Sequence, residues 1–226
     1  MFKRVLLLVC LVAVLVVPGV AAVVSVPCDT LDGWSADSGT WSAVGGLHLT
    51  SPTFSTLSYN IVPGFNGSCD YNVTCHVSWD SSNPSLIGIT MISLYSDSTR
   101  IFCFRDDDAW GSDSRHQMDV DIFSYNLPTN YVSSDYATFS GDVVFSRTGD
   151  VYSVCIGDYE LYSRSVSGFE GDITRIEYLV RRDYATPYEP YLHSVVYSDG
   201  VYDDVILGEP CTINVYDADT RLPLSG

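Results

Sequence analysis

The stretch YNVTCHVSWD, residues 71–80, decides the fold class of this 226-residue chain. Apolar and polar side chains alternate along it, namely Tyr71, Val73, Cys75, Val77 and Trp79 against Asn72, Thr74, His76, Ser78 and Asp80. Successive side chains of a β-strand point to opposite faces, so this pattern gives one apolar and one polar face. It is typical of an antiparallel sheet that is buried on one side and solvated on the other.

Other short segments rich in Val, Ile, Tyr, Phe and Thr follow, separated by Gly, Asp, Asn, Pro and Ser. Residues 142–163, DVVFSRTGDVYSVCIGDYELYS, predict turns at Thr148-Gly149-Asp150 and Gly157-Asp158. We expect further strands near residues 40–50, 54–61, 86–95, 99–105, 117–124, 173–181 and 193–207. Many short strands without helical periodicity predict an all-β fold, a two-sheet antiparallel sandwich or jelly roll.

The first 22 residues have the pattern of an export signal. Lys3 and Arg4 begin it, an apolar run covers residues 5–17, and Pro18-Gly19 with the small residues after it is typical of a processing site. The uncharged run continues to Val26, so an uncleaved anchor spanning about 20 residues is the alternative. Both interpretations predict a secreted or cell-surface protein.

The charge balance restricts the partners. Beyond the export signal, nine arginines are the only basic residues, against 28 acidic residues, of which 23 are aspartate. A chain this acidic is repelled by nucleic-acid phosphates and by anionic membranes. We therefore expect no nucleic acid as partner, and membrane contact only through an uncleaved N-terminal segment.

Six cysteines follow the export signal, namely Cys28, Cys69, Cys75, Cys103, Cys155 and Cys211. An even number of cysteines in an exported chain favours disulfides. The sequence has no C-x-x-C motif, so metal ligation is the weaker interpretation. A Cys28–Cys211 bridge would tie the two ends of the domain, and Cys103 and Cys155 are candidates to link neighbouring strands. Cys69 and Cys75 cannot bond within one straight strand, because six residues span about 20 Å. Either a tight loop precedes the strand or Cys69 has another partner, such as Cys211.

Two sequons flank the start of the alternating stretch. Asn66-Gly67-Ser68 and Asn72-Val73-Thr74 have the N-x-S/T pattern of an N-glycosylation acceptor. Such short patterns also arise by chance, so each sequon permits a glycan without requiring one.

Three segments in order resemble the concanavalin A-like, laminin-G-like jelly roll of lectins, adhesion modules and some glycoside hydrolases. They are LDGWSADSGTWSAVGGLHLTS (31–51), FSRTGDVYSVCIGDYELYS (145–163) and SDGVYDDVILG (198–208). The resemblance implies a jelly-roll domain over residues 27–210, and it implies a fold rather than an activity.

The last residues, CTINVYDADTRLPLSG (211–226), resemble the opening of a carboxypeptidase-regulatory-like β-sandwich. The matching positions are Val215, Asp217, Thr220, Pro223, Leu224 and Gly226. The resemblance implies the truncated start of a second β domain in a longer modular surface protein. An extra edge strand of the first domain is the alternative.

The carboxylates lack the arrangement that polysaccharide hydrolysis needs. Retaining enzymes with this jelly roll carry a Glu-x-Asp-x-Glu strand, which holds two carboxyl groups about 5–5.5 Å apart. The nearest segment, MDVDIF, has Asp119 and Asp121 on one face without either glutamate, and Glu160 and Glu177 are isolated. We therefore interpret the protein as a non-enzyme.

The segment FRDDDAWGSD, residues 104–113, is a candidate calcium site. Calcium takes 6–8 oxygen ligands. Asp106 and Asp108 share a face if this segment is a strand, Asp113 can approach from the loop, and Asp121 lies on the following strand. A hydrated acidic loop without a metal is the alternative.

Exposed aromatic rings are candidates for sugar stacking. Trp110 lies beside the aspartates of residues 104–113, and Tyr184, Tyr188 and Tyr191 belong to RRDYATPYEPYLH, residues 181–193. Packing at the sandwich ends, with hydroxyl groups in water, is the alternative for each ring. The other tryptophans are expected in the core, namely Trp34, Trp41 and Trp79.

The sequence as a whole predicts an exported binding or adhesion module, with an extracellular glycan as the preferred partner and a surface protein as the other. A structural spacer or coat domain is the second interpretation, and a glycoside hydrolase-like enzyme is the third. Calcium is the one cofactor we expect.

Overall fold

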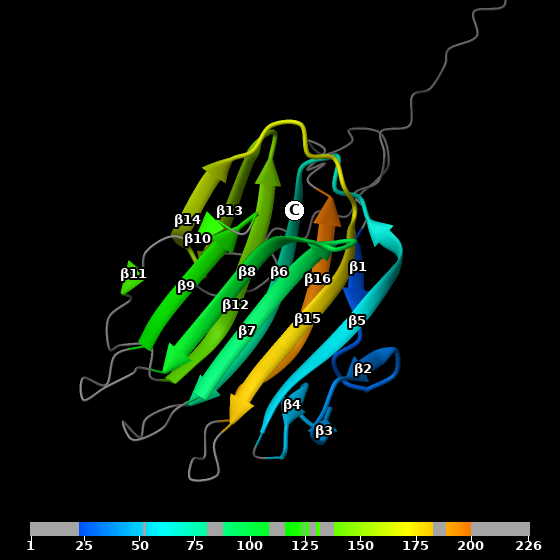
Figure 1. Ribbon diagram of the computed structural model, residues 1–226, viewed down its shortest axis with the longest axis vertical. Helices are drawn as coiled ribbons and strands as arrows, with labels where there is room; N and C mark the ends of the chain where they lie inside the picture. The colour runs from blue at the N-terminus through cyan, green and yellow to red at the C-terminus, as the bar shows by residue number, and fades with distance from the viewer. Residues whose placement is uncertain are drawn as a thin grey trace, which may run out of the picture. The chain divides into compact units, whose positions relative to one another are not determined.

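The computed structural model describes residues 23–51, 53–80, 88–108, 116–123, 125–126, 130–131, 138–182 and 189–199. Over these ranges the chain forms two antiparallel sheets that pack face to face (Figure 1). The same ranges contain no helix that is long and apolar enough to cross a membrane. The predicted export signal and the predicted second domain at residues 211–226 lie outside the described residues.

A six-stranded sheet forms one layer. Its strands, in spatial order, are β1 (Val23–Val26), β16 (Tyr191–Asp199), β6 (Tyr71–Asp80), β12 (Thr138–Thr148), β13 (Val151–Ile156) and β14 (Tyr159–Ser165). β6 pairs with β16 on one side and with β12 on the other. Both edges of β6 are hydrogen-bonded, so its two faces are what differ in environment. Apolar residues occupy the face toward the core, and polar residues occupy the outer face.

The alternation that decides the fold is confirmed in β6. Its apolar residues Tyr71, Val73, Cys75, Val77 and Trp79 are at most 2% exposed. The polar residues between them, Asn72, Thr74, His76 and Ser78, are half-buried on the outer face. The two-sheet antiparallel arrangement follows from this pattern, as predicted.

An eight-stranded sheet forms the other layer. Its path is β10 (Tyr125–Asn126), β9 (His116–Ile122), β8 (Thr99–Asp108), β7 (Gly88–Ser96), β15 (Ile173–Arg182), β5 (Phe54–Phe65) and β2 (Trp34–Ala36), and β11 (Asn130–Tyr131) pairs with β9. Figure 1 shows β9, β8, β7, β15 and β5 side by side, in front of the six-stranded sheet.

Both predicted turns in residues 142–163 are confirmed. β12, β13 and β14 form two successive antiparallel hairpins. The turns contain Gly149 and Gly157, with φ values of 57° and 54°. Glycine adopts this left-handed conformation without the steric penalty of a Cβ atom, so these residues fix where the chain reverses.

The predicted strand at residues 40–50 is broken in two. β3 (Trp41–Ser42) and β4 (His48–Leu49) pair in a small two-stranded sheet. Gly46, between them, has a φ of 123°, which turns the chain. Leu47 is fully buried and forms an isolated bridge with Leu192 of β16, so this hairpin is tied to the six-stranded sheet.

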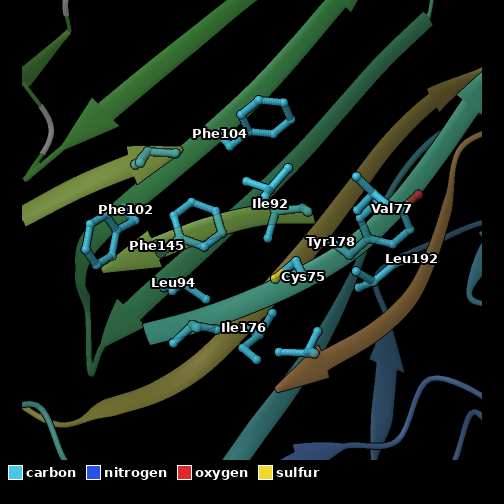
Figure 2. Packing of buried hydrophobic residues seen from close by; sticks show 14 of the residues in the cluster. Cys75, Val77, Ile92, Leu94, Phe102, Phe104, Phe145, Ile176, Tyr178 and Leu192 are labelled. Atoms are coloured by element: carbon cyan, nitrogen blue, oxygen red, sulfur yellow. The ribbon is translucent and has the colours of Figure 1, made fainter. Parts of the chain in front are cut away.

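Side chains from both sheets meet in one core (Figure 2). Phe102 of β8 lies opposite Phe145 of β12, with ring centroids 5.4 Å apart, and Trp79 of β6 is 6.4 Å from Phe104 of β8. Burying one such side chain contributes about 1.5–3 kcal/mol. These contacts hold the layers together and leave the outer faces of both sheets for other chemistry.

The three tryptophans among the described residues follow the prediction closely. Trp41 and Trp79 are 8% and 2% exposed and belong to the core. Trp34 is partly buried against that core, and its Nε1 donates a hydrogen bond to the carbonyl of Pro27 at 2.7 Å. The indole groups therefore serve packing rather than ligand contact.

Candidate functional site

The outer face of the eight-stranded sheet carries aligned rows of polar and charged side chains. Strand pairing places Glu177 of β15, Ser93 of β7, Cys103 of β8 and Asp121 of β9 in one row. Their chain neighbours belong to the core, so this row points away from it. We call this surface the charged face, formed by Ser93, Tyr95, Arg100, Cys103, Arg105, Asp119, Asp121, Arg175 and Glu177.

Three guanidinium–carboxylate pairs lie on the charged face, two between β8 and β9 and one within β15. Arg100 Nη2 donates to Asp121 Oδ2 at 2.5 Å, Arg105 Nη2 donates to Asp119, and Arg175 Nε lies 3.1 Å from Glu177 Oε1. The six side chains are between 12% and 39% exposed. They are thus accessible from solvent, yet each is held in one orientation before any ligand arrives, which lowers the entropy cost of binding.

Tyr95 adds an aromatic ring to the charged face. The guanidinium of Arg175 lies 4.3 Å from the ring centroid, a cation–π distance. Burial raises the pKa of Tyr95 above its usual value, and its hydrogen bond to Glu177 raises it further. The phenol therefore stays protonated at neutral pH and acts as a hydrogen-bond donor.

Two small residues lie beneath the arginines. Ser93 is fully buried, and Cys103 is 4% exposed. Burial raises the pKa of the Cys103 thiol, against the smaller opposing effects of the Ser93 hydrogen bond and of the Arg100 charge. A nucleophilic cysteine needs thiolate character at working pH, which this buried thiol lacks.

The chemistry of the charged face is that of fixed donors beside fixed acceptors. A guanidinium has five N–H donors and a carboxylate about four acceptor sites, so each group can take part in several hydrogen bonds at once. Hydrogen bonds to ionised groups are roughly twice as strong as neutral ones. A ligand with many hydroxyl groups, each able to donate and to accept, is complementary to this pattern.

The structure separates the aspartates of the predicted calcium site. Asp106 is fully buried on the core side of β8, where strand pairing places it between Thr90 and Met118. Asp121 points to the opposite face and is bound by Arg100. These two carboxylates cannot share one ion across the sheet.

The side chains of the other two predicted calcium ligands, Asp108 and Asp113, are not described by the structure. Asp108 is the last residue of β8. Within the described ranges, no group of three or more His, Cys, Asp or Glu side chains is arranged to hold a metal. Calcium binding therefore stays a prediction.

Of the four rings predicted to stack on sugar, Tyr191 alone is described. It lies on β16, with its ring 4.5 Å from His48 and 5.8 Å from His193. Its hydroxyl donates to Glu189 at 3.2 Å. Trp110, Tyr184 and Tyr188 lie outside the described residues, so a platform of all four rings stays a prediction.

Sequence reasoning missed a histidine cluster on the outer face of the six-stranded sheet. His76 Nδ1 lies 2.8 Å from Asp142 Oδ1, and its ring is 5.4 Å from that of His193. His193 Nε2 lies 2.7 Å from the hydroxyl of Ser78. Burial lowers the pKa of His193, and His76 lowers it further. No spacing motif reveals this cluster, because its members come from different strands.

The structure excludes one predicted disulfide. Cys103 lies on β8 and Cys155 on β13, in different sheets, and both side chains point away from the core. The Cys103–Cys155 link is therefore wrong, because packed sheets are about 10 Å apart.

The five described cysteines are free, and burial raises the pKa of Cys28 to about 12. Cys211 lies outside the described residues, so its pairing stays a prediction.

Comparison with known proteins gives a fold without a family. No protein-family model matches the chain, and no curated protein matches it. The solved CBM2 module of the evolved Dit of Lactobacillus casei BL23 phage J-1 is similar at a TM-score of 0.63 and 13% identity, over 79% of this chain and 96% of that one. The Emp47p carbohydrate recognition domain follows at 0.56 and 11%, over 78% and 95%.

A transglycosylase shares the same architecture. Crh5, solved in complex with NAG, is similar at a TM-score of 0.54 and 13% identity, over 79% of this chain and 84% of that one. At these identities the likeness establishes the fold alone. The predicted concanavalin A-like, two-sheet jelly-roll sandwich is confirmed, and the activity has to be argued from the charged face.

Proposed function

We propose that the protein is an exported, non-catalytic binding module that recognises carbohydrate through the charged face. The observation that carries this proposal is the set of three ordered guanidinium–carboxylate pairs on one outer surface. The fold supports it, because solved proteins of this architecture include a module and a domain named for carbohydrate recognition. The N-terminal sequence supports export to where extracellular glycans occur.

A spacer or coat domain would not need this arrangement. Partly exposed ion pairs contribute only about 0–1 kcal/mol to folding, so stability does not explain three of them on one face. Five of the nine arginines that follow the export signal lie on two strands of this one sheet, β8 and β15, which β7 separates; they are Arg100, Arg105, Arg175, Arg181 and Arg182. Recognition of a ligand explains this concentration better than a structural role does.

The positions of the carboxylates favour binding over hydrolysis. Glu177 and Asp121 share a row, but three strand spacings of about 4.8 Å separate β15 from β9. Paired catalytic carboxyl groups lie at most about 9.5 Å apart, and one of them must carry a proton. On the charged face the carboxylate oxygens of Asp119 and Asp121 each accept a hydrogen bond from an arginine.

A glycan array probed with the secreted protein tests this proposal. The test variant is Arg100→Gln with Asp121→Asn, which removes one charge pair and keeps a polar side chain at each position. The matched control is His76→Gln with Asp142→Asn, a cross-strand pair on the outer face of the other sheet.

We expect the wild type to bind a defined group of glycans. The test variant should lose at least about tenfold in affinity, the equivalent of one charged hydrogen bond or more, while the control keeps its affinity. Equal losses in both variants, or no glycan bound by the wild type, would contradict the proposal. A melting temperature within about 3 °C of the wild type ensures that each variant is folded.

A further inference from the structure

The two sequons differ in local structure. Asn66 is exposed, and its Oδ1 accepts hydrogen bonds from the backbone N–H of Ser68 at 3.0 Å and from the Ser68 hydroxyl at 2.8 Å. This is an Asx turn, in which the side chain bonds to the chain two residues on. It brings the acceptor amide and the hydroxyl of the sequon together and directs the amide nitrogen away from both bonds.

The Asn66 loop is held in this conformation by surrounding elements. Gly67 N donates to Asp172 Oδ1 at 3.1 Å, and the Gly67 carbonyl accepts a hydrogen bond from the buried guanidinium of Arg147. The hydroxyl of Tyr197 donates to the Asn66 carbonyl at 2.8 Å. A Cβ atom on Gly67 would lie within 3 Å of the backbone of Gly171, so only glycine fits there. The turn is therefore built into the fold.

Asn72 has none of these features. It lies within β6, half-buried, opposite Ser146 of β12 on one side and Ser198 of β16 on the other. Both edges of the strand are hydrogen-bonded, so residues 72–74 are held extended and cannot form the same turn. The second sequon therefore lacks the local geometry of the first.

Asn66 also lies beside an apolar hollow. A cavity of about 360 Å³ opens between β1 and the second half of β5, and Asn66 is one of its lining residues. Val62, on its rim, is 90% exposed, and Val24 is 43% exposed. Rings of Phe65 and Tyr197, stacked at 4.5 Å, form part of the lining. Exposed apolar surface of this kind is costly in water unless something covers it.

We propose that Asn66, and not Asn72, carries an N-linked glycan, whose first sugar rings cover this hollow. The co-reactant is an oligosaccharide linked to a polyprenyl diphosphate. The Asn66 Nδ2 forms a bond to C1 of the first sugar, the C1–O bond to the diphosphate breaks, the amide gives up one proton, and the lipid diphosphate leaves. The apolar C–H faces of the sugars then pack on the exposed apolar lining, chiefly Val62 and Val24.

Secretion of the full chain behind an established export leader, in a eukaryotic cell, tests the attachment. Intact mass and peptide mapping follow enzymatic release of N-glycans, which converts the modified asparagine to aspartate. We expect the conversion at Asn66, its loss in Asn66→Gln and in Ser68→Ala, and its retention in Asn72→Gln. A glycan on Asn72, or an unmodified secreted wild type, would overturn the assignment.

The position of the sugars needs a second readout. Fluorescence of a dye that binds apolar surface is compared between the glycosylated and the enzymatically released protein, with Val62→Ser as the matched variant. We expect several-fold higher fluorescence after release in the wild type, and a smaller rise in Val62→Ser. Equal fluorescence before and after release would show that the glycan leaves the hollow uncovered, and would overturn that part of the proposal.

Discussion

The two faces of the eight-stranded sheet are made by the same strands and do different work. Along β8, Phe102 and Phe104 point into the core, whereas Cys103 and Arg105 point to the charged face. Inside, stability comes from non-directional burial of apolar area. Outside, partly exposed ion pairs contribute little stability, and in the proposed function they recognise the ligand. Substitutions on the two faces should therefore separate folding from binding.

The largest effect is expected in the core. Phe102→Ala removes a ring that lies 5.4 Å from Phe145 and 5.8 Å from Tyr152. We expect the free energy of unfolding to fall by about 3–5 kcal/mol, because the cavity adds to the lost burial. Denaturant unfolding measures this change. A loss below about 1 kcal/mol would mean that the two layers are not held by these rings.

A hydrogen-bond chain that begins at the buried indole of Trp41 should give the next largest effect. Trp41 Nε1 donates to the Ser55 hydroxyl at 2.9 Å, and Ser55 Oγ lies 2.9 Å from Asp37 Oδ1. Ser55→Ala leaves the indole N–H without its partner, which costs about 1–3 kcal/mol. Thermal unfolding measures the loss, and Ser163→Ala, whose hydroxyl donates to Glu160 at an exposed site outside this chain, serves as the control.

The same chain should make stability depend on pH. Burial tends to raise the pKa of Asp37, but hydrogen bonds from Thr56 N, Ser55 and Ser38 outweigh it and lower that pKa below 3.8. A lowered folded-state pKa stabilises the protein at all pH values above the unfolded pKa, and this contribution is lost as pH falls through the folded value. Asp37→Asn should therefore be less stable than the wild type at neutral pH, with the difference shrinking below pH 3.8. A difference that is the same at pH 7 and pH 3 would contradict this.

The smallest effect on stability is expected on the charged face. Arg175→Gln removes the ion pair with Glu177 and the cation–π contact with Tyr95. We expect the free energy of unfolding to change by less than about 1 kcal/mol, because the pair is partly exposed. Glycan affinity should fall clearly at the same time. A large loss of stability with unchanged affinity would reverse the comparison between the two faces.

Much of the fold is readable from the sequence, because periodicity reports burial directly. β6 has the predicted bounds, and both glycine turns after β12 are where their residues place them. The prediction did less well at residues 40–50, where Gly45 and Gly46 break the strand through positive φ values. It also joined Cys103 to Cys155, because alternation says which face a residue occupies but not in which sheet its strand lies.

The candidate site was harder to predict for a physical reason. Asp119 and Asp121 were seen to share a face, but their partners Arg105 and Arg100 come from another strand. Cross-strand pairs depend on register, and register is set by the whole sheet. One signal was available in the sequence. Arginines and acidic residues both occupy the polar positions of strands in which polar and apolar residues alternate, as Arg175 and Glu177 do.

The central claim is that the charged face binds carbohydrate, and mapping the contact by NMR tests it most directly. The strongest binder from the glycan array is titrated into isotopically labelled protein, and backbone amide shifts are followed. We expect the largest changes in β7, β8 and β15, around Ser93, Cys103 and Glu177. Changes centred on His76 in β6, or on no part of the eight-stranded sheet, would contradict the claim.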